Sequence, residues 1–509
     1  MLPPQHPESR QHATLSAQYR PDPPATLNPS MLIRNSIAYL LARGMPALLN
    51  FLGIALFTRL LSPEAYGTYA LVLAITGFGN ILFFEWLQGG LLRYRTRYDE
   101  HLSVFLSTTL AGYLTALGAN TLLLLLVFVF IGDDPLAHWL PWIWGLLGLW
   151  GAFEVALKLT AAESNPLAFG ILNTAKTGFF VLFGGLLAWQ GYQAQGVIAG
   201  YIGAMLLALL LFGGKTWLKV RARRVDTNLL RQLFSYGLPL TATLGLSAII
   251  GNSDRLLLAW LQGSATTGLY AAGYDLPNQA LGVLLVITYL AGYPLAVRDL
   301  EQGERERARQ RLGHYVRLLL GIGIPAAIGM AVLAPAIANA VLGEDFRPSA
   351  QTLIPLIALA ALLVNIKTFY FDLAFQLGQH TRGLLPILGL AVLLNIVLNL
   401  LLIPEFGLTG AAYATIAAQS FGLLYSALSG RRHFRLPYPL LDTGKMLLAS
   451  ACMAMAIWHF RDTDSLPVLT AAVILGVTVY GLGVLAMDAA QARSYLLQYI
   501  GRLCARQNL

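Results

Sequence analysis

The chain alternates between long apolar stretches and short polar links. A helix needs roughly 20 apolar residues to cross the hydrocarbon core of a bilayer. Fourteen stretches are candidates for such helices, the thirteenth being the weakest because its apolar part is short: residues 36–58, 69–91, 102–131, 136–157, 167–189, 194–213, 233–260, 267–292, 316–342, 351–373, 384–403, 409–428, 445–460 and 466–487. They lack the two-residue alternation of transmembrane barrel strands. The pattern therefore predicts an all-α polytopic membrane protein with about fourteen transmembrane helices.

The lysines and arginines are distributed very unequally over the links between these spans. In membrane proteins the cytoplasmic links hold the excess of Lys and Arg. If the N-terminus is cytoplasmic, 28 of the 34 Lys and Arg fall on the cytoplasmic side. Four fall on the outer side and two inside spans: Arg59, Arg255, Arg347 and Arg461, and Lys176 and Lys367. A missed span would exchange the sides of every later link, and the later Lys and Arg would then fall on the outer side. Because they do not, we predict fourteen spans with both termini in the cytoplasm.

Two of the outer links resemble each other in sequence. Residues 59–72 read RLLSPEAYGTYALV, and residues 260–273 read WLQGSATTGLYAAG. The shared positions are Gly67 with Gly268, Tyr69 with Tyr270 and Ala70 with Ala271, and an earlier Gly-x-Pro recurs at Gly44–Pro46 and Gly237–Pro239. Chance recurrence in apolar sequence is one explanation. The common topology favours the other, a parallel repeat of six spans, in which two lobes rock around a central site.

The spans and links divide the chain into five parts. These are a cytoplasmic tail over residues 1–30, a first lobe over 31–214 (spans 1–6), a second lobe over 215–435 (spans 7–12), two extra spans over 436–490, and a cytoplasmic C-terminal tail over 491–509. The first tail is rich in Pro and polar residues, and it lacks the apolar core of a signal peptide. Its composition predicts disorder.

Composition and charge narrow the possible functions. Apolar residues make up 56% of the chain and charged residues 12%, whereas a soluble domain has about 25% charged residues. The net charge of +9 fits Lys- and Arg-rich cytoplasmic links, so we expect no nucleic-acid partner. The two cysteines, Cys452 and Cys504, have no neighbours at metal-ligand spacing, and the sequence has no P-loop. We expect no metal site, no cofactor and no ATP hydrolysis.

Three stretches together resemble a known family: TRLLSPEAYGTYALV, NSDRLLLAWLQGSATTGLYAAGYDL and LNLLLIPEFGLTGAAYATIAA. In this order, and with fourteen spans, they resemble the polysaccharide transporter family of the multidrug/oligosaccharidyl-lipid/polysaccharide exporter superfamily. The resemblance covers all fourteen spans. It implies a V-shaped pair of lobes around a hydrophilic cavity, with spans 13 and 14 at the periphery beside a groove for a lipid tail.

The resemblance also implies a substrate and a location. Bacterial members of the family flip undecaprenyl-diphosphate-linked oligosaccharides across the inner membrane, for the synthesis of O-antigen, capsule or exopolysaccharide. This glycolipid and membrane lipids are therefore the expected partners, with a polysaccharide polymerase and glycosyltransferases as further ones. An anionic diphosphate needs cationic side chains in the cavity, and arginine suits this task because its donors form a fork.

Charged residues inside spans are the candidate site residues, because a charge at the bilayer centre costs about 2.5–3.5 kcal/mol on insertion scales. The candidate substrate-binding residues are Arg43, Lys176 and Lys367. Arg43 lies near the cytoplasmic end of span 1, where its side chain either points into the cavity or extends to the lipid headgroups. The family resemblance favours the cavity.

A second set of charges is assigned to gating or ion coupling: Arg59, Glu85, Asp254, Arg255 and Asp275. Asp254 and Arg255 are adjacent near the outer end of span 7, so they point to different faces of the helix. We favour a lock between this pair and the first lobe, with Arg59 as the partner, over a direct contact with substrate.

Three other functions fit parts of the pattern. A multidrug exporter of the same superfamily would have twelve spans. A membrane polysaccharide polymerase or ligase would need a catalytic cluster on a sizeable outer loop, whereas the outer links here are short. A scaffold for glycan assembly would need neither intramembrane charges nor a repeat. The sequence therefore favours a flippase that is not an enzyme.

Overall fold

The computed structural model describes residues 29–98, 100–132, 135–163, 165–213, 224–489 and 493, with side chains from residue 44 onward except at 131, 135 and 136. Apart from residues 29, 30 and 493, the two predicted tails lie outside this description, and so does the side chain of Arg43. Every regular element of the described residues is a helix. The predicted all-α class is confirmed.

The long helices follow one another with short links. They are α2 (Pro29–Leu60), α3 (Pro63–Tyr94), α4 (Leu102–Ile131), α5 (Leu140–Ala162), α6 (Pro166–Leu187), α7 (Gln193–Phe212), α8 (Thr227–Glu301), α9 (Arg305–Val332), α10 (Ala334–Val341), α11 (Arg347–Ile366), α12 (Leu373–Leu377), α13 (Leu384–Gly430), α14 (Leu440–Ile457) and α15 (Leu466–Ala486). Short 3-10 or π turns connect several of them.

Three glycines divide continuous helical runs into shorter spans. Ten helical runs of the described residues are long and apolar enough to cross a membrane, and a further apolar segment covers Gly44–Leu60. Gly191, Gly263 and Gly407 have positive φ angles of 94°, 88° and 59°, and they break the runs that contain α6 and α7, α8, and α13. With each broken run taken as two spans, the arrangement is consistent with the fourteen spans predicted.

Local sequence signals explain where several helices begin. Pro63 occupies the first turn of α3, where its missing N–H costs nothing, and Ser62 caps that turn by accepting a hydrogen bond from Ala65 N at 3.3 Å. Asn165 caps α6 in the same way, with Pro166 next in sequence. The turn between α2 and α3 is therefore a sharp one, which allows the two helices to run in opposite directions.

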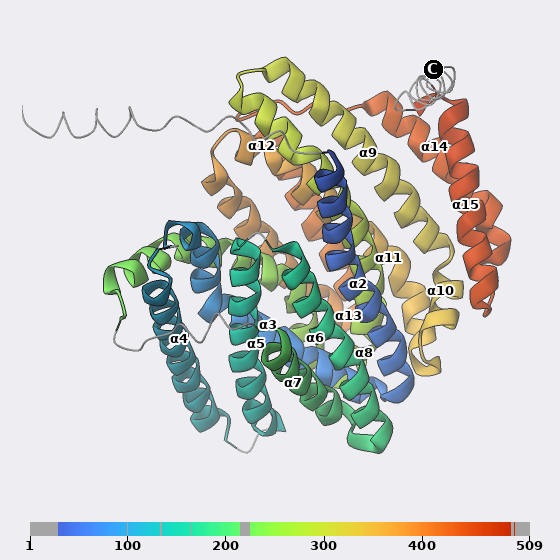
Figure 1. Cartoon of the computed structure of the whole chain (residues 1–509). Helices are drawn as coiled ribbons and strands as arrows, with labels where there is room; N and C mark the ends of the chain where they lie inside the picture. The colour runs from blue at the N-terminus through green and yellow to red at the C-terminus, as the bar shows by residue number, and fades with distance from the viewer. Residues whose placement is uncertain are drawn as a thin grey trace, which may run out of the picture.

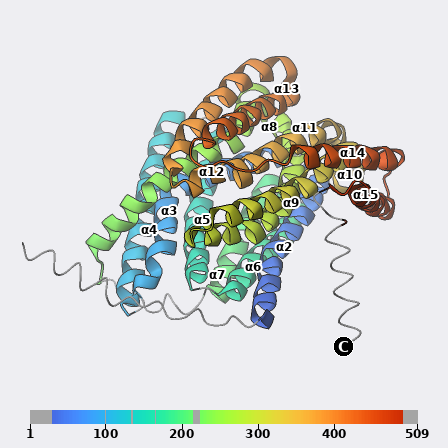
Figure 2. The same ribbon diagram turned by 90° about the horizontal axis from the view of Figure 1, so that it is seen from above.

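The helices form two groups (Figure 1). In the first group α2, α3, α5, α6 and α7 share a core that contains Phe57, Phe153 and Phe180. In the second group α9, α11 and α13 pack on α8. Helix α4 lies at one edge of the molecule and α15 at the opposite edge (Figures 1 and 2).

The two C-terminal helices are fastened to the second group. Arg317 Nε of α9 lies 2.7 Å from Asp442 Oδ2 of α14. Tyr480 of α15 donates a hydrogen bond to the Gly321 carbonyl of α9 at 2.8 Å. These contacts join α14 and α15 to α9.

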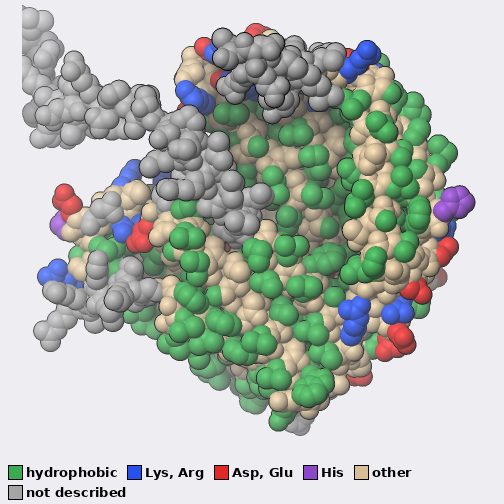
Figure 3. Space-filling model, turned by 45° about the vertical axis from the view of Figure 1, so that its right-hand side comes forward, with side chains coloured by type: hydrophobic (Ala, Val, Ile, Leu, Met, Phe, Trp, Pro, Cys, Tyr) green, Lys and Arg blue, Asp and Glu red, His purple; other side chains and the backbone are tan. Residues whose placement is uncertain are grey.

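The outer surface of the helices is strongly apolar. Hydrophobic side chains cover most of the face seen in Figure 3, and charged side chains lie toward its edges. On α4, Leu122, Val129 and Phe130 are 70%, 75% and 80% exposed. Soluble proteins rarely expose large contiguous apolar patches, and here they occur on helices long enough to span a bilayer. The protein is a multi-pass membrane protein.

Candidate functional site

The two copies of the repeated link meet at one end of the molecule. We call this end outer, and the end at which α8 and α9 begin inner, following the predicted topology. A Cβ atom added to Gly67 would lie 1.8 Å from Ser264 O and 2.8 Å from Gly268 N, and one added to Gly268 would lie 2.0 Å from Pro63 O and 2.7 Å from Gly67 N. The two helices are thus in direct backbone contact, which only glycine permits. This reciprocal contact explains why the chain contains the link twice.

A cavity of about 270 Å³ lies between the two helix groups. Its wall contains residues of α2, α3, α6, α7 and α8, and it brings together three of the predicted charges: Lys176, Arg255 and Asp275. Polar and aromatic residues complete the wall, among them Asn50, Tyr66, Tyr69, Thr177, Tyr201 and Gln279. Tyr66 and Tyr69 are on the first turns of α3 beside Gly67, so the cavity lies close to the glycine contact.

Arg255 and Asp275 form an ion pair inside the second group. Arg255 Nη2 donates to Asp275 Oδ1, and their side chains are 11% and 30% exposed. Two polar atoms of the same wall, Arg255 Nε and Gln279 Oε1, are buried and have no hydrogen-bond partner among the described residues. Buried polar groups are costly unless they are paired, so these atoms indicate a place for water or a ligand.

Lys176 supplies a second cation from the first group. It is on α6, and its Nζ lies 4.9 Å from the centroid of the Phe153 ring. It forms no ion pair with any described carboxylate within 4.0 Å. Together Lys176, Arg255 and Asp275 leave the cavity with one positive charge in excess. The sequence identified all three residues but not their proximity.

Asp254 belongs to a separate buried cluster. Its side chain is 1% exposed, and it accepts hydrogen bonds from Tyr270 at 2.7 Å, Asn399 at 2.7 Å and Thr415 at 2.5 Å. All three donors are uncharged, and the described residues place no cation within 4.0 Å of the carboxylate. Asn399 also donates to Asn395 Oδ1 at 3.1 Å, while Asn399 Oδ1 is buried without a described partner.

The lock between Asp254 and Arg59 is not formed in this conformation. Arg59 Nη2 donates instead to the Ala340 carbonyl at 2.8 Å. This contact joins the outer end of α2 to α10. Asp254 cannot take part because it is enclosed between α8 and α13. Arg59 therefore fastens the two groups through a backbone carbonyl and not through a carboxylate.

Two other predicted residues lie away from the cavity wall. Glu85 of α3 is 8% exposed, and the charges that act on it are Lys158 and Glu154 of α5. Lys367 is 4% exposed and its Nζ lies 2.8 Å from Asp372 Oδ2. This pair closes the π turn Lys367–Phe371 within the second group, so Lys367 lies outside this cavity wall, and its role in substrate binding stays a prediction.

Sequence reasoning missed the polar partners of the charged residues. Asn395 and Asn399 are four residues apart in an apolar span, which places both on one face of the helix. That spacing was a usable signal, because polar residues inside spans face the bundle interior. Tyr69 was noticed as part of the repeat, but nothing in the sequence says that it faces a cavity.

Comparison with known proteins identifies the family. A family model described as polysaccharide biosynthesis protein matches residues 56–351, more than half of the chain. The chain belongs to this family. The resemblance drawn from the three sequence stretches, to the polysaccharide transporters of the exporter superfamily, is thereby confirmed.

Individual relatives are distant in sequence, but the alignments cover nearly their whole length. The chain is 22% identical over 476 residues to the probable low-salt glycan biosynthesis flippase Agl15 of Haloferax volcanii, covering 88% of this chain and 94% of that protein. It is 20% identical over 412 residues to a putative O-antigen transporter of Shigella flexneri, covering 75% of this chain and 93% of the relative.

Solved structures share the fold. The lipid II flippase MurJ, in an inward closed conformation, has a TM-score of 0.71 and 17% identity, over 89% of this chain and 99% of that one. An inward-facing multidrug resistance transporter of the MATE family has a TM-score of 0.58 and 13% identity, over 77% and 97%. At these identities the likeness concerns the fold alone.

Proposed function

We propose that the protein flips an undecaprenyl-diphosphate-linked oligosaccharide across the bacterial inner membrane, for the synthesis of O-antigen, capsule or exopolysaccharide. The observation that carries this proposal is the cavity beneath the Gly67–Gly268 contact, with its unpaired Lys176 and partly unpaired Arg255. The names of two relatives, a probable glycan biosynthesis flippase and a putative O-antigen transporter, support a glycolipid as the substrate.

The cavity residues suit the head of such a glycolipid. Lys176 and Arg255 belong to different helix groups, so an anionic diphosphate between them would be held from both sides. Arg255 presents a free Nε beside its bond to Asp275, and charge-assisted hydrogen bonds of this kind are about twice as strong as neutral ones. Tyr66 and Tyr69 also border the cavity, with their rings packed on Phe346 and Phe180.

The proposed route is alternating access between the two groups. The outer end is closed by backbone contact at Gly67 and Gly268. Near the inner end α3 also packs closely on α8, as shown by the 1.9 Å between Trp86 O and a Cβ added to Gly237. By contrast, a Cβ on Gly44 of α2 would meet no described atom within 4 Å. The substrate head enters between α2 and α8, while its lipid tail stays in the bilayer.

Asp254 is the proposed coupling group. A buried carboxylate without a cationic neighbour is expensive, and an incoming proton or sodium ion would neutralise it. Both Asp254 oxygens accept hydrogen bonds, and a proton or sodium ion would bind at one of them. The network lies on α8 and α13, so occupation of the site changes the packing of the helix that also carries Arg255.

The orientation and neighbours follow from the same proposal. Both termini are cytoplasmic, glycosyltransferases on the cytoplasmic face supply the finished lipid-linked unit, and a polysaccharide polymerase on the outer face consumes it. The chain itself transports and does not catalyse.

Reconstitution into liposomes tests the proposal. Purified protein, supplied with a fluorescent undecaprenyl-diphosphate oligosaccharide, should expose the sugar on both leaflets. Lys176→Ala and Arg255→Ala should each reduce the flipping rate at least about tenfold, because each removes a charge-assisted contact of about 1.5–3 kcal/mol. Arg461→Ala, a charge loss at the outer end of α14 outside the cavity, is the matched control and should retain the full rate.

The alternative is a multidrug exporter of the same superfamily, since the chain shares its fold with MATE transporters. It predicts efflux of cationic dyes from the same liposomes and no movement of the glycolipid. That outcome would overturn the proposed substrate and leave the alternating-access architecture in place.

A further inference from the structure

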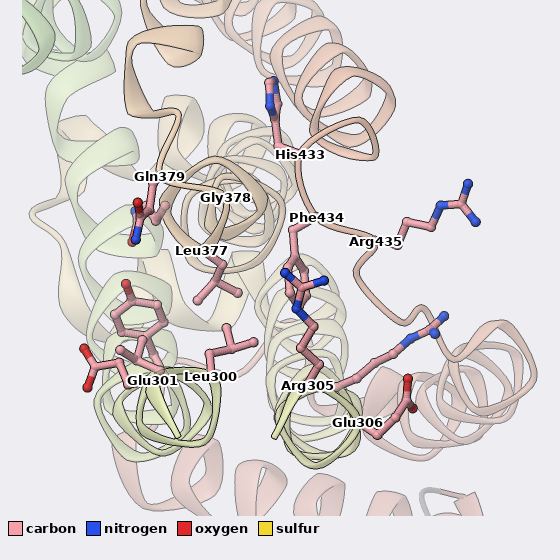
Figure 4. A pocket seen from close by; sticks show the side chains of 14 residues that line it. Leu300, Glu301, Arg305, Glu306, Leu377, Gly378, Gln379, His433, Phe434 and Arg435 are labelled. Carbon is pink, nitrogen blue, oxygen red and sulfur yellow. The ribbon is translucent and has the colours of Figure 1, made fainter. Parts of the chain in front are cut away.

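A second, larger cavity opens at the inner end of the second helix group. It has a volume of about 800 Å³, and it lies between the end of α8, the start of α9, α12 and the segment that follows α13 (Figure 4). The cavity between the two groups shares no lining residue with it. The proposed transport route therefore leaves this cavity unexplained.

The first turns of α9 carry two kinds of arginine. Arg307 is paired with Glu304, and Arg311 is paired with Asp299. Arg305 and Arg309 have no ion pair with any described carboxylate, and both line the cavity. Their spacing of four residues places them on the same face of the helix. The helix thus directs its unneutralised arginines into the cavity and its neutralised ones elsewhere.

The opposite wall adds more groups that bind anions. Arg435 and His433 come from the segment after α13, and the side-chain amides of Gln376 and Gln379 come from α12 and the turn that follows it. Arg435 also lacks an ion pair with any described carboxylate. In Figure 4, however, the Arg435 side chain extends outward and the His433 ring points away from Phe434, where it stacks on His380 with the ring centroids 4.6 Å apart.

Two carboxylates belong to the lining, Glu301 and Glu306. In Figure 4 the carboxylate of Glu301 lies at the edge and points away from the cavity, whereas Arg305 extends toward Phe434 across it. With three arginines against two carboxylates, the lining keeps a net positive charge before His433 is counted. Leu300, Leu377 and Phe434 give the same cavity an apolar side.

We propose that this inner cavity binds the phosphate group of an anionic lipid, held by Arg305 and Arg309 on α9. The forked donors of arginine match phosphate oxygens, and basic pockets between transmembrane helices on the cytoplasmic side are suited to anionic headgroups. The apolar side accommodates the glycerol and the first carbons of the acyl chains. The bound lipid would join the α8–α9 turn to the segment leading to α14. This inference does not depend on the transported substrate.

Native mass spectrometry of the detergent-purified protein with added phosphatidylglycerol tests the site. The double variant Arg305→Gln/Arg309→Gln should bind phosphatidylglycerol at least about tenfold more weakly, since each basic residue near an anionic surface contributes roughly fivefold. The control variant Arg307→Gln/Arg431→Gln loses the same charge outside the cavity and should bind as the wild type does. Arg305→Lys keeps the charge without the fork and should fall between them.

Competition distinguishes the source of the phosphate. If excess inorganic phosphate displaces phosphatidylglycerol from the wild type but not from the double variant, the cavity recognises phosphate from a soluble source as well. If phosphate has no effect while the double variant still loses affinity, the ligand is the lipid. Equal phosphatidylglycerol binding by the two double variants, both with wild-type melting temperature, would overturn the proposal.

Discussion

Residues 59–72 and 260–273 have related sequences and begin their helices at corresponding places, yet their tyrosines face different surroundings. Tyr69 lines the cavity between the helix groups. Tyr270 is 1% exposed and donates its hydroxyl to Asp254 at 2.7 Å. The glycines do not differ in this way, because Gly67 and Gly268 each contact the backbone of the other copy.

The difference shows which part of a repeat the fold constrains. A contact between two backbones across a pseudo-two-fold axis needs the same small residue on both sides, so the glycine has to recur. A side chain that points away from the axis meets different neighbours in each half and is free to take a different role. The first copy contributes to the cavity, and the second contributes to the buried Asp254 network.

The largest expected effect comes from breaking the shared glycine contact. Gly67→Val and Gly268→Val should each abolish glycolipid flipping while the protein still inserts, because the new side chains would overlap backbone atoms less than 3 Å away. The outer end could then not close. A cysteine at Ser264, in a background without Cys452 and Cys504, should react faster with an impermeant thiol reagent added from outside.

The control for this change is Gly118→Ala on α4, where an added Cβ meets no described atom within 4 Å. It should leave both flipping and labelling unchanged. Normal flipping by Gly67→Val at wild-type protein level would contradict the outer closure.

The next change tests Asp254, the carboxylate that Tyr270 of the second copy contacts, separately from the cavity that Tyr69 of the first copy lines. Asp254→Asn keeps the size of the side chain and removes its charge, so the coupling ion loses its main ligand. Flipping driven by an imposed proton or sodium gradient should fall about tenfold or more, toward the rate without a gradient. A flippase whose gradient dependence is unchanged in Asp254→Asn would rule out this residue as the coupling group.

A matched pair of tyrosine changes sharpens the same distinction. Tyr270→Phe removes a buried hydrogen bond to a carboxylate and should lower the free energy of unfolding by about 1–2 kcal/mol. Tyr69→Phe removes a hydroxyl that borders a cavity, so it should leave thermal stability unchanged and weaken the apparent affinity for the glycolipid a few-fold. Thermal melting in detergent and substrate titration measure the two effects. Identical behaviour of the two variants would mean that the copies are equivalent after all.

The sequence predicted the helices better than it predicted the site. Long apolar runs and unequal Lys and Arg content are properties of single segments, so spans and the all-α class could be derived from them. Which face of a helix a charge occupies depends on rotation and packing. For this reason Arg255, together with Asp254, is assigned from the sequence to a lock with Arg59, whereas Arg255 pairs with Asp275, twenty residues along the chain.

Burial depth was equally hard to predict. Lys176 and Lys367 both lie inside apolar spans, and both are assigned from the sequence to substrate binding. The structure pairs Lys367 with Asp372, five residues away across a π turn, and leaves Lys176 at the cavity wall. A regular α-helix would not bring residues five apart together. The pairing therefore follows from a local change of helix geometry, which the composition does not predict.

The last comparison concerns the other repeated feature, Gly-x-Pro, and it includes the smallest expected effect, that of Gly44→Ala. Gly237 lies against the backbone of Trp86, whereas Gly44 faces no described atom within 4 Å. Gly237→Ala should therefore lower the thermal stability and the flipping rate, because α8 must move away from α3. Gly44→Ala should be neutral for flipping and slightly stabilising, since alanine is favoured over glycine inside a helix by about 1 kcal/mol. The melting temperature and the flipping rate of the two variants, measured side by side, test this difference. If Gly44→Ala stops flipping, then α2 closes against α8 at this point during the cycle, and the two copies of Gly-x-Pro form equivalent contacts in alternate states.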